Sequence, residues 1–294
     1  MGRPGVSLRA SIIGALLVAL ALLGGCSAVR FAYNQAPDLA YWWLDSYVDF
    51  DDSQSPRARD AIASWFNWNR STQLADYAAL LERAQAQIAL PTTPAQVCQL
   101  IDDATARFET AIDRALFVMA PSVRQFTPQQ LAHLEHKYAK NNDEYAHDFL
   151  QAVPEERLVA SVKRVVDRAE LIYGSLSDSQ RERLARGVAE SPFDAELWMG
   201  ERKRRQQDVL QSLRRLSAER ASVGDSYAAL TLLWQQTMRS PRDDYRDYQQ
   251  RLRQYNCALA AQMHNLSTPE QRQRAAGRLR GWAEDLRALA AAAP

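Results

Sequence analysis

Prolines that follow a hydroxyl residue constrain the fold of this chain more than any other feature. A Ser or Thr side chain caps free N–H groups of the first helical turn, and a proline at the first helical position forfeits no hydrogen bond. Six such pairs occur: Ser55-Pro56, Thr93-Pro94, Thr127-Pro128, Ser191-Pro192, Ser240-Pro241 and Thr268-Pro269. Each predicts a helix start, and Ala36-Pro37, Val153-Pro154 and Ser177 are expected to act likewise.

Amphipathic segments fill the intervals between these starts. They cover residues 37–50, 56–89, 94–119, 128–151, 154–174, 178–190, 192–215, 218–239, 241–264 and 269–291. Across two of them, Leu213, Leu216, Val223, Tyr227 and Leu230 recur at the spacing of a core-facing stripe. Ala, Leu, Arg, Gln and Glu dominate, while Val and Ile are sparse, which favours helix over strand. We expect an all-α fold, a multi-helix bundle of antiparallel amphipathic helices.

Residues 1–25 have the pattern of a secretory signal peptide. Arg3 and Arg9 precede an almost wholly apolar run from Ser11 to Leu23. This run is shorter than the roughly 18 residues that a membrane-spanning helix needs. Residues 23–26, LGGC, resemble the lipobox of bacterial lipoproteins, which implies that Cys26 becomes the acylated first residue. The alternatives are an ordinary signal peptide with an incidental cysteine, or a buried thiol in a helix.

The expected mature chain, residues 26–294, is an all-helical domain tethered to a membrane without crossing it. Acyl chains on Cys26 suffice for stable anchoring, and Ser27, in place of the Asp that usually retains lipoproteins in the inner membrane, implies an outer-membrane address facing the periplasm. The whole chain has a formal net charge of +1 at pH 7, including Arg3 and Arg9. Without these two arginines the expected mature chain has a net charge near −1. It has no global positive field, so we expect no nucleic-acid partner.

Two further cysteines, Cys98 and Cys257, follow in the inferred periplasmic domain. A pair of thiols in an oxidising compartment usually forms a disulfide, so we predict a Cys98–Cys257 bridge. The alternative is two buried, unpaired cysteines that act as small hydrophobic side chains.

Aromatic residues are densest in residues 31–50 and 65–68. An aromatic core between the first helices is the favoured interpretation, because Asp38, Asp45, Asp49, Asp51 and Asp52 would be repelled by an anionic leaflet. A membrane-interfacial helix or a ligand groove are the alternatives. The residues of a possible interaction surface are Tyr41, Trp42, Trp43, Asp45, Trp65 and Trp68.

No motif in the sequence predicts catalysis, a cofactor or a metal. His133, Glu135, His136 and His147 could suggest a metal site, but they do not form a known ligand pattern, so we expect none. The sequence lacks a nucleophile elbow, a P-loop and a dinucleotide fingerprint. Adjacent acids, Asp102-Asp103 and Asp243-Asp244, point apart on a helix and are expected to be solvated.

Two basic runs could bind lipid phosphates or an acidic partner. They comprise Arg202, Lys203, Arg204, Arg205, Arg214, Arg215 and Arg220. Acidic residues interleave with both runs, so a solvent-exposed face is the ordinary interpretation.

Two resemblances extend these expectations. The segments FTPQQ (126–130), LSDSQ (176–180) and LSTPEQ (266–271) resemble the LTxxQ motif of Spy and Cpx-type periplasmic chaperones, although capped helix starts show the same pattern. The segment YNQAPDLAYWWLDSYVDF (33–50), followed by WFNWNR (65–70), resembles an uncharacterised family of proteobacterial lipoproteins. That resemblance implies location and fold, and no activity.

The expected function is therefore non-catalytic: an envelope scaffold or chaperone-like module that binds protein partners in a helical groove. The first alternative is a cell-wall enzyme or its activator, which requires a convergent acid pair in a pocket. The second is a lipid-binding module that uses the arginine-rich faces. The oligomeric state has no signature in the sequence.

Overall fold

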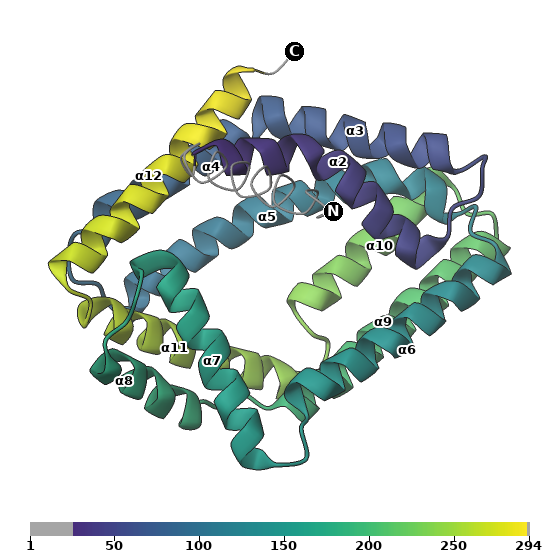
Figure 1. Cartoon of the computed structure of the whole chain (residues 1–294). Coiled ribbons are helices and arrows are strands. Elements are labelled where there is room, and N and C mark those ends of the chain that lie inside the picture. The colour runs from purple at the N-terminus through teal and green to yellow at the C-terminus, as the bar shows by residue number, and fades with distance from the viewer. Residues whose placement is uncertain (1–25, 293–294) are drawn as a thin grey trace, which may run out of the picture.

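The computed structural model describes residues 26–292, so the predicted signal peptide, residues 1–25, lies outside the described residues. The described residues form eleven helices and no strands, which confirms the all-α prediction (Figure 1). The helices are α2 (Cys26–Val48), α3 (Ser55–Thr72), α4 (Leu74–Ile88), α5 (Pro94–Val123), α6 (Pro128–Phe149), α7 (Pro154–Tyr173), α8 (Asp178–Ala189), α9 (Ala195–Ala218), α10 (Val223–Met238), α11 (Asp243–Asn265) and α12 (Pro269–Ala291).

The helices are arranged around a circuit (Figure 1). In that view α2 and α3 lie at the top, α6, α9 and α10 at the right, α7, α8 and α11 at the lower left, and α12 with α4 at the left. The longest helix, α5, contacts α3, α4, α9, α10 and α11 and so connects the sides of the circuit.

The circuit closes where α12 packs along α4, far apart in sequence. Both buried faces are rich in alanine, including Ala78 of α4 and Ala275 of α12, neither of which is exposed at all. Small side chains let two helix backbones approach closely. At the surface, Arg287 of α12 donates two hydrogen bonds of 2.6 and 2.7 Å to the carboxylate of Glu82 on α4.

Four predicted helix starts are confirmed as capping boxes, at Thr93, Thr127, Ser177 and Thr268. In each, the hydroxyl accepts a hydrogen bond from the backbone N–H of a glutamine three residues later. The side-chain oxygen of that glutamine accepts one from the backbone of the cap residue. Local sequence is sufficient here because both partners lie within four residues.

Other predicted starts are wrong in detail. Pro37 lies inside α2, which begins eleven residues earlier at Cys26, so Ala36-Pro37 starts no helix. Asp194, whose carboxylate accepts from the N–H of Leu197, caps α9 in place of Ser191. Two predicted cap residues do not cap their helices. Ser55 is already the first residue of α3, and α11 begins after Arg242, two residues beyond Ser240.

The predicted helix over residues 56–89 is divided at Gln73 into α3 and α4. The hydroxyls of Ser71 and Thr72 do not cap α4. They donate hydrogen bonds to backbone carbonyls one turn earlier, Ser71 to Asn67 at 2.9 Å and Thr72 to Trp68 at 2.6 Å. Such bonds compete with the helical ladder and commonly bend or end a helix.

The capping glutamines also join helices in pairs. Gln180 and Gln271 donate to each other's side-chain oxygens at 2.8 and 3.0 Å, and each donates again to a backbone carbonyl, of Leu266 and Ser175. Gln130 pairs in the same way with Gln54, with bonds of 2.5 and 3.3 Å. The three LTxxQ-like segments therefore each supply a capped helix start whose glutamine joins it to another helix start. FDDSQ (50–54) is a fourth segment of this kind.

A hydrophobic cluster lies beside each glutamine pair. The larger cluster comes from α2, α5, α6, α9 and the connection between α5 and α6, and it comprises Val48, Val123, Phe126, Leu131, Leu134, Leu210, Leu213 and Leu216. The smaller one gathers Leu176, Leu184 and Met263 near α8 and α11. The predicted disulfide is present, joining Cys98 of α5 to Cys257 of α11 with an S–S distance of 2.03 Å.

Candidate functional site

Helix α7 is amphipathic but poorly covered by the rest of the described chain. It has a row of Leu and Val side chains, yet none of its 20 residues is buried. Its C-terminal half contributes Val165 and Val166 to the smaller cluster. Toward its N-terminus, Leu158 and Val159 are 41% and 70% exposed, so this part of an amphipathic helix has no apolar neighbour to cover it.

A groove of about 960 Å³ runs along this uncovered side, between α7, the connection from α8 to α9, and α11. Leu158 and Val165 line it from α7, and Leu252 and Leu259 line it from α11. Phe193, from the connection, completes the apolar lining. We name this feature the α7–α11 groove. It is large enough for a peptide segment or a drug-sized molecule.

Three arginines of α7 also line the groove, at positions 157, 164 and 168. Arg164 is held in place, because it donates to the carbonyl of Asp148 at 3.1 Å and its guanidinium lies 4.2 Å from the Phe149 ring centroid. Within residues 26–292, the ion pairs of α7 are Lys163–Asp167 and Arg181–Glu170, and neither Arg157 nor Arg168 forms one. The groove thus combines an apolar lining with guanidinium groups that are available to an anion.

Two acidic residues line the same groove, Asp194 and Glu196. The carboxylate of Asp194 is occupied as the cap of α9, where it accepts from Leu197 N at 2.9 Å. The geometry therefore suits recognition of an apolar and anionic partner more than acid–base catalysis, which requires two carboxylates free to meet a substrate.

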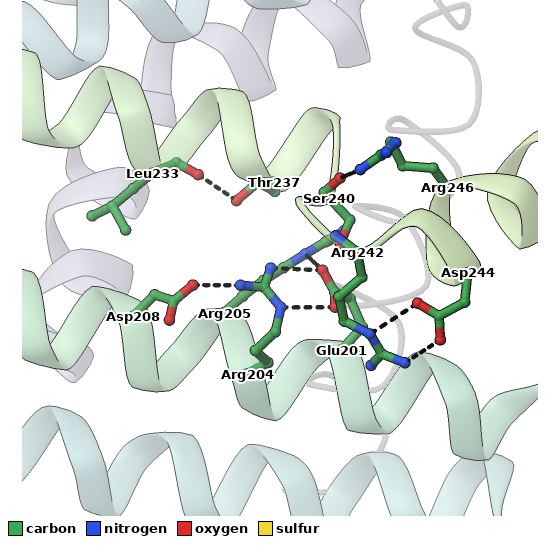
Figure 2. A network of polar contacts seen from close by, with 10 residues as sticks. All are labelled: Glu201, Arg204, Arg205, Asp208, Leu233, Thr237, Ser240, Arg242, Asp244 and Arg246. Carbon is green, nitrogen blue, oxygen red and sulfur yellow. Dashed lines mark hydrogen bonds and ion pairs between the residues drawn. The ribbon is translucent and has the colours of Figure 1, made fainter.

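Two residues of the predicted basic run at 202–205, Arg204 and Arg205, bind a buried carboxylate (Figure 2). Glu201, which is fully buried, accepts two hydrogen bonds from Arg204, at 2.7 and 2.9 Å, and one from Arg205 at 3.1 Å. Arg204 also donates to Asp208 at 2.5 Å. We name Glu201 with these two arginines the Glu201 cluster.

Ser240 ties this cluster to the connection between α10 and α11 (Figure 2). Its carbonyl accepts a hydrogen bond of 2.8 Å from Arg246. Burial alone would raise the pKa of Glu201, but hydrogen bonds from Arg204 and Ser240, together with the charge of Arg204, lower it. The carboxylate is therefore held ionised inside the protein, and the cluster joins α9 to the start of α11.

The other residues of the two predicted basic runs differ in their surroundings. Arg202 donates to Asn142 at 2.8 Å and lies over the rings of Tyr145 and Trp198. Arg214 pairs with Glu135 at 2.6 Å. Lys203, Arg215 and Arg220 are exposed. The arginines that line the groove were missed from the sequence, although residues 157, 164 and 168 share one helix face.

The structure divides the six residues of the predicted interaction surface. Tyr41 is buried, with its hydroxyl 3.0 Å from Ser55 Oγ. Trp65 donates to the carbonyl of Ala111 at 2.8 Å, and Trp68 packs beside it. Asp45 accepts from the Phe50 N–H at 3.0 Å. Trp42 and Trp43 are instead 59% and 61% exposed, so the six do not form one continuous surface.

The polar residues that could suggest a metal or an acid pair are dispersed. In the described part of the chain, no group of three or more His, Cys, Asp or Glu side chains could hold a metal ion. His133 lies 3.1 Å from the carbonyl of Ser46 and His147 lies beside Asp148. The adjacent acids form surface ion pairs: Asp102 with Arg253, Asp103 with Arg83, Asp243 with Arg246 and Asp244 with Arg242.

The described residues define an all-α protein with a large arginine-lined groove. Between Cys26 and Ala292, no helix is both long and apolar enough to span a bilayer. The chain belongs to a family of unknown function, DUF6279, which matches residues 46–246. No curated protein and no solved structure matches it.

Proposed function

We propose that this protein is a periplasmic lipoprotein, anchored in the outer membrane through Cys26, that binds a segment of a partner protein in the α7–α11 groove. The observation that carries the binding role is the juxtaposition of an uncovered apolar helix face with unpaired arginines. The anchor is supported by the signal pattern and LGGC at residues 23–26.

The chemistry of the groove favours an amphipathic segment with acidic residues along one side. Its apolar residues would cover Leu158, Val165 and Phe193, which removes apolar surface from water. Arg157 and Arg168 are eleven residues apart, or about 16 Å along a helix. A partner helix of three turns would therefore reach both guanidinium groups with carboxylates.

Binding to the groove is tested with an unlipidated protein, residues 27–294, and a fluorescent helical peptide. The peptide has a leucine stripe flanked by glutamates, and we expect saturable binding by anisotropy. Arg157→Glu with Arg168→Glu should weaken binding at least about tenfold, which is 1.4 kcal/mol. Lys203→Glu with Arg215→Glu makes the same charge change on exposed residues outside the groove lining and should leave the affinity within twofold.

Three outcomes contradict the proposed groove. An equal loss in both variants would mean that net charge alone attracts the peptide. Tight binding of a peptide in which lysines replace the glutamates would show that the arginines do not recognise an anionic partner. Saturable binding of anionic vesicles without peptide binding would favour the alternative of a lipid-binding module. The anchor is tested separately, by mass spectrometry of the mature N-terminus, which should carry acyl chains on Cys26.

A further inference from the structure

Helix α2 presents one apolar, uncharged face that no other part of the described chain covers. Phe31, Leu39, Trp42 and Trp43 lie on it and are 69%, 54%, 59% and 61% exposed. Projected on a helical wheel, Ala32, Gln35 and Ser46 fall among them, and all three are exposed. This set contains no charged residue.

The opposite face of α2 packs into the domain. The hydroxyl of Tyr33 donates to Asn69 at 2.9 Å, while Tyr41 and Val48 are buried. The side chains of Phe31 and Trp42 therefore lie outside the aromatic core, and Trp43 borders it through Tyr47 of the same helix, with 4.9 Å between the ring centroids. The sequence interpretation of a single aromatic core holds for only half of the helix surface.

Two of the aspartates that argue against membrane contact belong to α2: Asp38 lies at the edge of this face, seven residues after Phe31 and four before Trp42, and Asp45 lies further round the helix. Asp38 faces Arg59, with 3.3 Å between carboxylate and guanidinium, and the carboxylate of Asp45 accepts from the backbone of Phe50. Asp49, Asp51 and Asp52 follow the end of α2.

We propose that the exposed face of α2 lies in the headgroup region of the bilayer that anchors Cys26. This inference rests on the proposed lipid anchor. Helix α2 begins at Cys26 itself, so no linker separates the acyl chains from the face. Trp side chains prefer this interface, and an uncharged Phe, Leu and Trp stripe suits insertion at the boundary between headgroups and acyl chains. The occupant is thus a lipid surface.

This contact fixes the orientation of the domain. From Phe31 to Trp43 the face extends about 18 Å, so the domain meets the bilayer along a line and not at a point. A lipid tether alone leaves a domain free to tumble, whereas a tether combined with an embedded helix holds it in one orientation relative to the membrane.

The experiment uses the acylated protein in phosphatidylethanolamine–phosphatidylglycerol vesicles with bromine on the acyl chains near the glycerol. Bromine quenches nearby Trp fluorescence, and we expect clear quenching of the native protein. Trp42→Phe with Trp43→Phe should abolish most of it. Trp198→Phe with Trp234→Phe, on α9 and α10, is the matched control and should leave the quenched signal unchanged.

The outcomes separate this inference from the anchor. Protein that does not float with the vesicles shows that the lipid anchor is wrong. Protein that floats but is not quenched, or whose quenching survives Trp42→Phe with Trp43→Phe, overturns the membrane contact. Self-association of the unlipidated protein that Trp42→Ser abolishes would assign the face to a second copy and would also overturn it.

Discussion

The arginines of α9 and those of α7 both have acidic residues near them in the sequence, but their surroundings in the structure are opposite. On α9, Arg204 and Arg205 enclose the buried carboxylate of Glu201. On α7, Arg157 and Arg168 line an open groove and form no ion pair in the described part of the chain. The difference shows that a run of arginines in the sequence can be neutralised by an acid of the same helix, so the run alone does not identify a binding surface.

The arginines of α9 and of α7 also differ in how much stability the protein should lose when their charges or partners are removed. Removing one partner from a buried ion pair leaves an uncompensated charge and costs several kcal/mol. Removing an exposed charge without a partner costs little. Mutations in the Glu201 cluster should therefore reduce stability, and mutations in the groove should reduce binding.

The largest effect is expected for Glu201→Gln, which keeps the shape of the side chain and removes its charge. We expect the free energy of unfolding, measured by urea denaturation of the unlipidated protein, to fall by about 3 kcal/mol or more. Glu135→Gln, at the exposed pair with Arg214, is the control and should change it by less than about 1 kcal/mol. Equal effects of the two would remove the distinction between buried and exposed clusters.

A smaller effect on the free energy of unfolding is expected when the pH is lowered. Since the native pKa of Glu201 lies below its ordinary value of 4.5, its stabilisation is complete above that pH and is lost as the pH falls through the native pKa. The difference in unfolding free energy between the native protein and Glu201→Gln should therefore narrow between pH 7 and pH 3. A gap that stays constant or widens would contradict this.

The smallest effect is expected for Arg157→Gln with Arg168→Gln. Neither side chain has an ion-pair partner within residues 26–292, so the unfolding free energy should stay within about 0.5 kcal/mol of the native value. Urea denaturation checks this. A loss above 1 kcal/mol would mean that these arginines support the fold, and the contrast with α9 would disappear.

Much of the fold follows from local sequence rules, and the failures have a common cause. Capping boxes at Thr127 and Ser177 depend on residues three positions apart, so the sequence predicts them. Pro37 and Ser191 mislead because contacts with residues distant in sequence help to place the segments around them: Tyr33 of α2 donates to Asn69, and the N–H of Asp194, the cap of α9, donates to Tyr248.

The site was less predictable than the fold. The Cys98–Cys257 bridge was inferred from the compartment and is present. Which arginines are available to a partner could not be inferred, because this depends on where each acid lies in three dimensions. Glu201 is in sequence an ordinary helix residue, and only the packing of the loop around Ser240 buries it.

The pairing of α4 with α12 has a consequence for the order in which the chain can fold. During synthesis α4 is made before α12, which is the last of the described helices. The alanine face of α4 therefore stays uncovered until α12 has been made, and contacts between such distant segments form slowly. A chain that ends before α12 should keep the earlier helices but leave the circuit open.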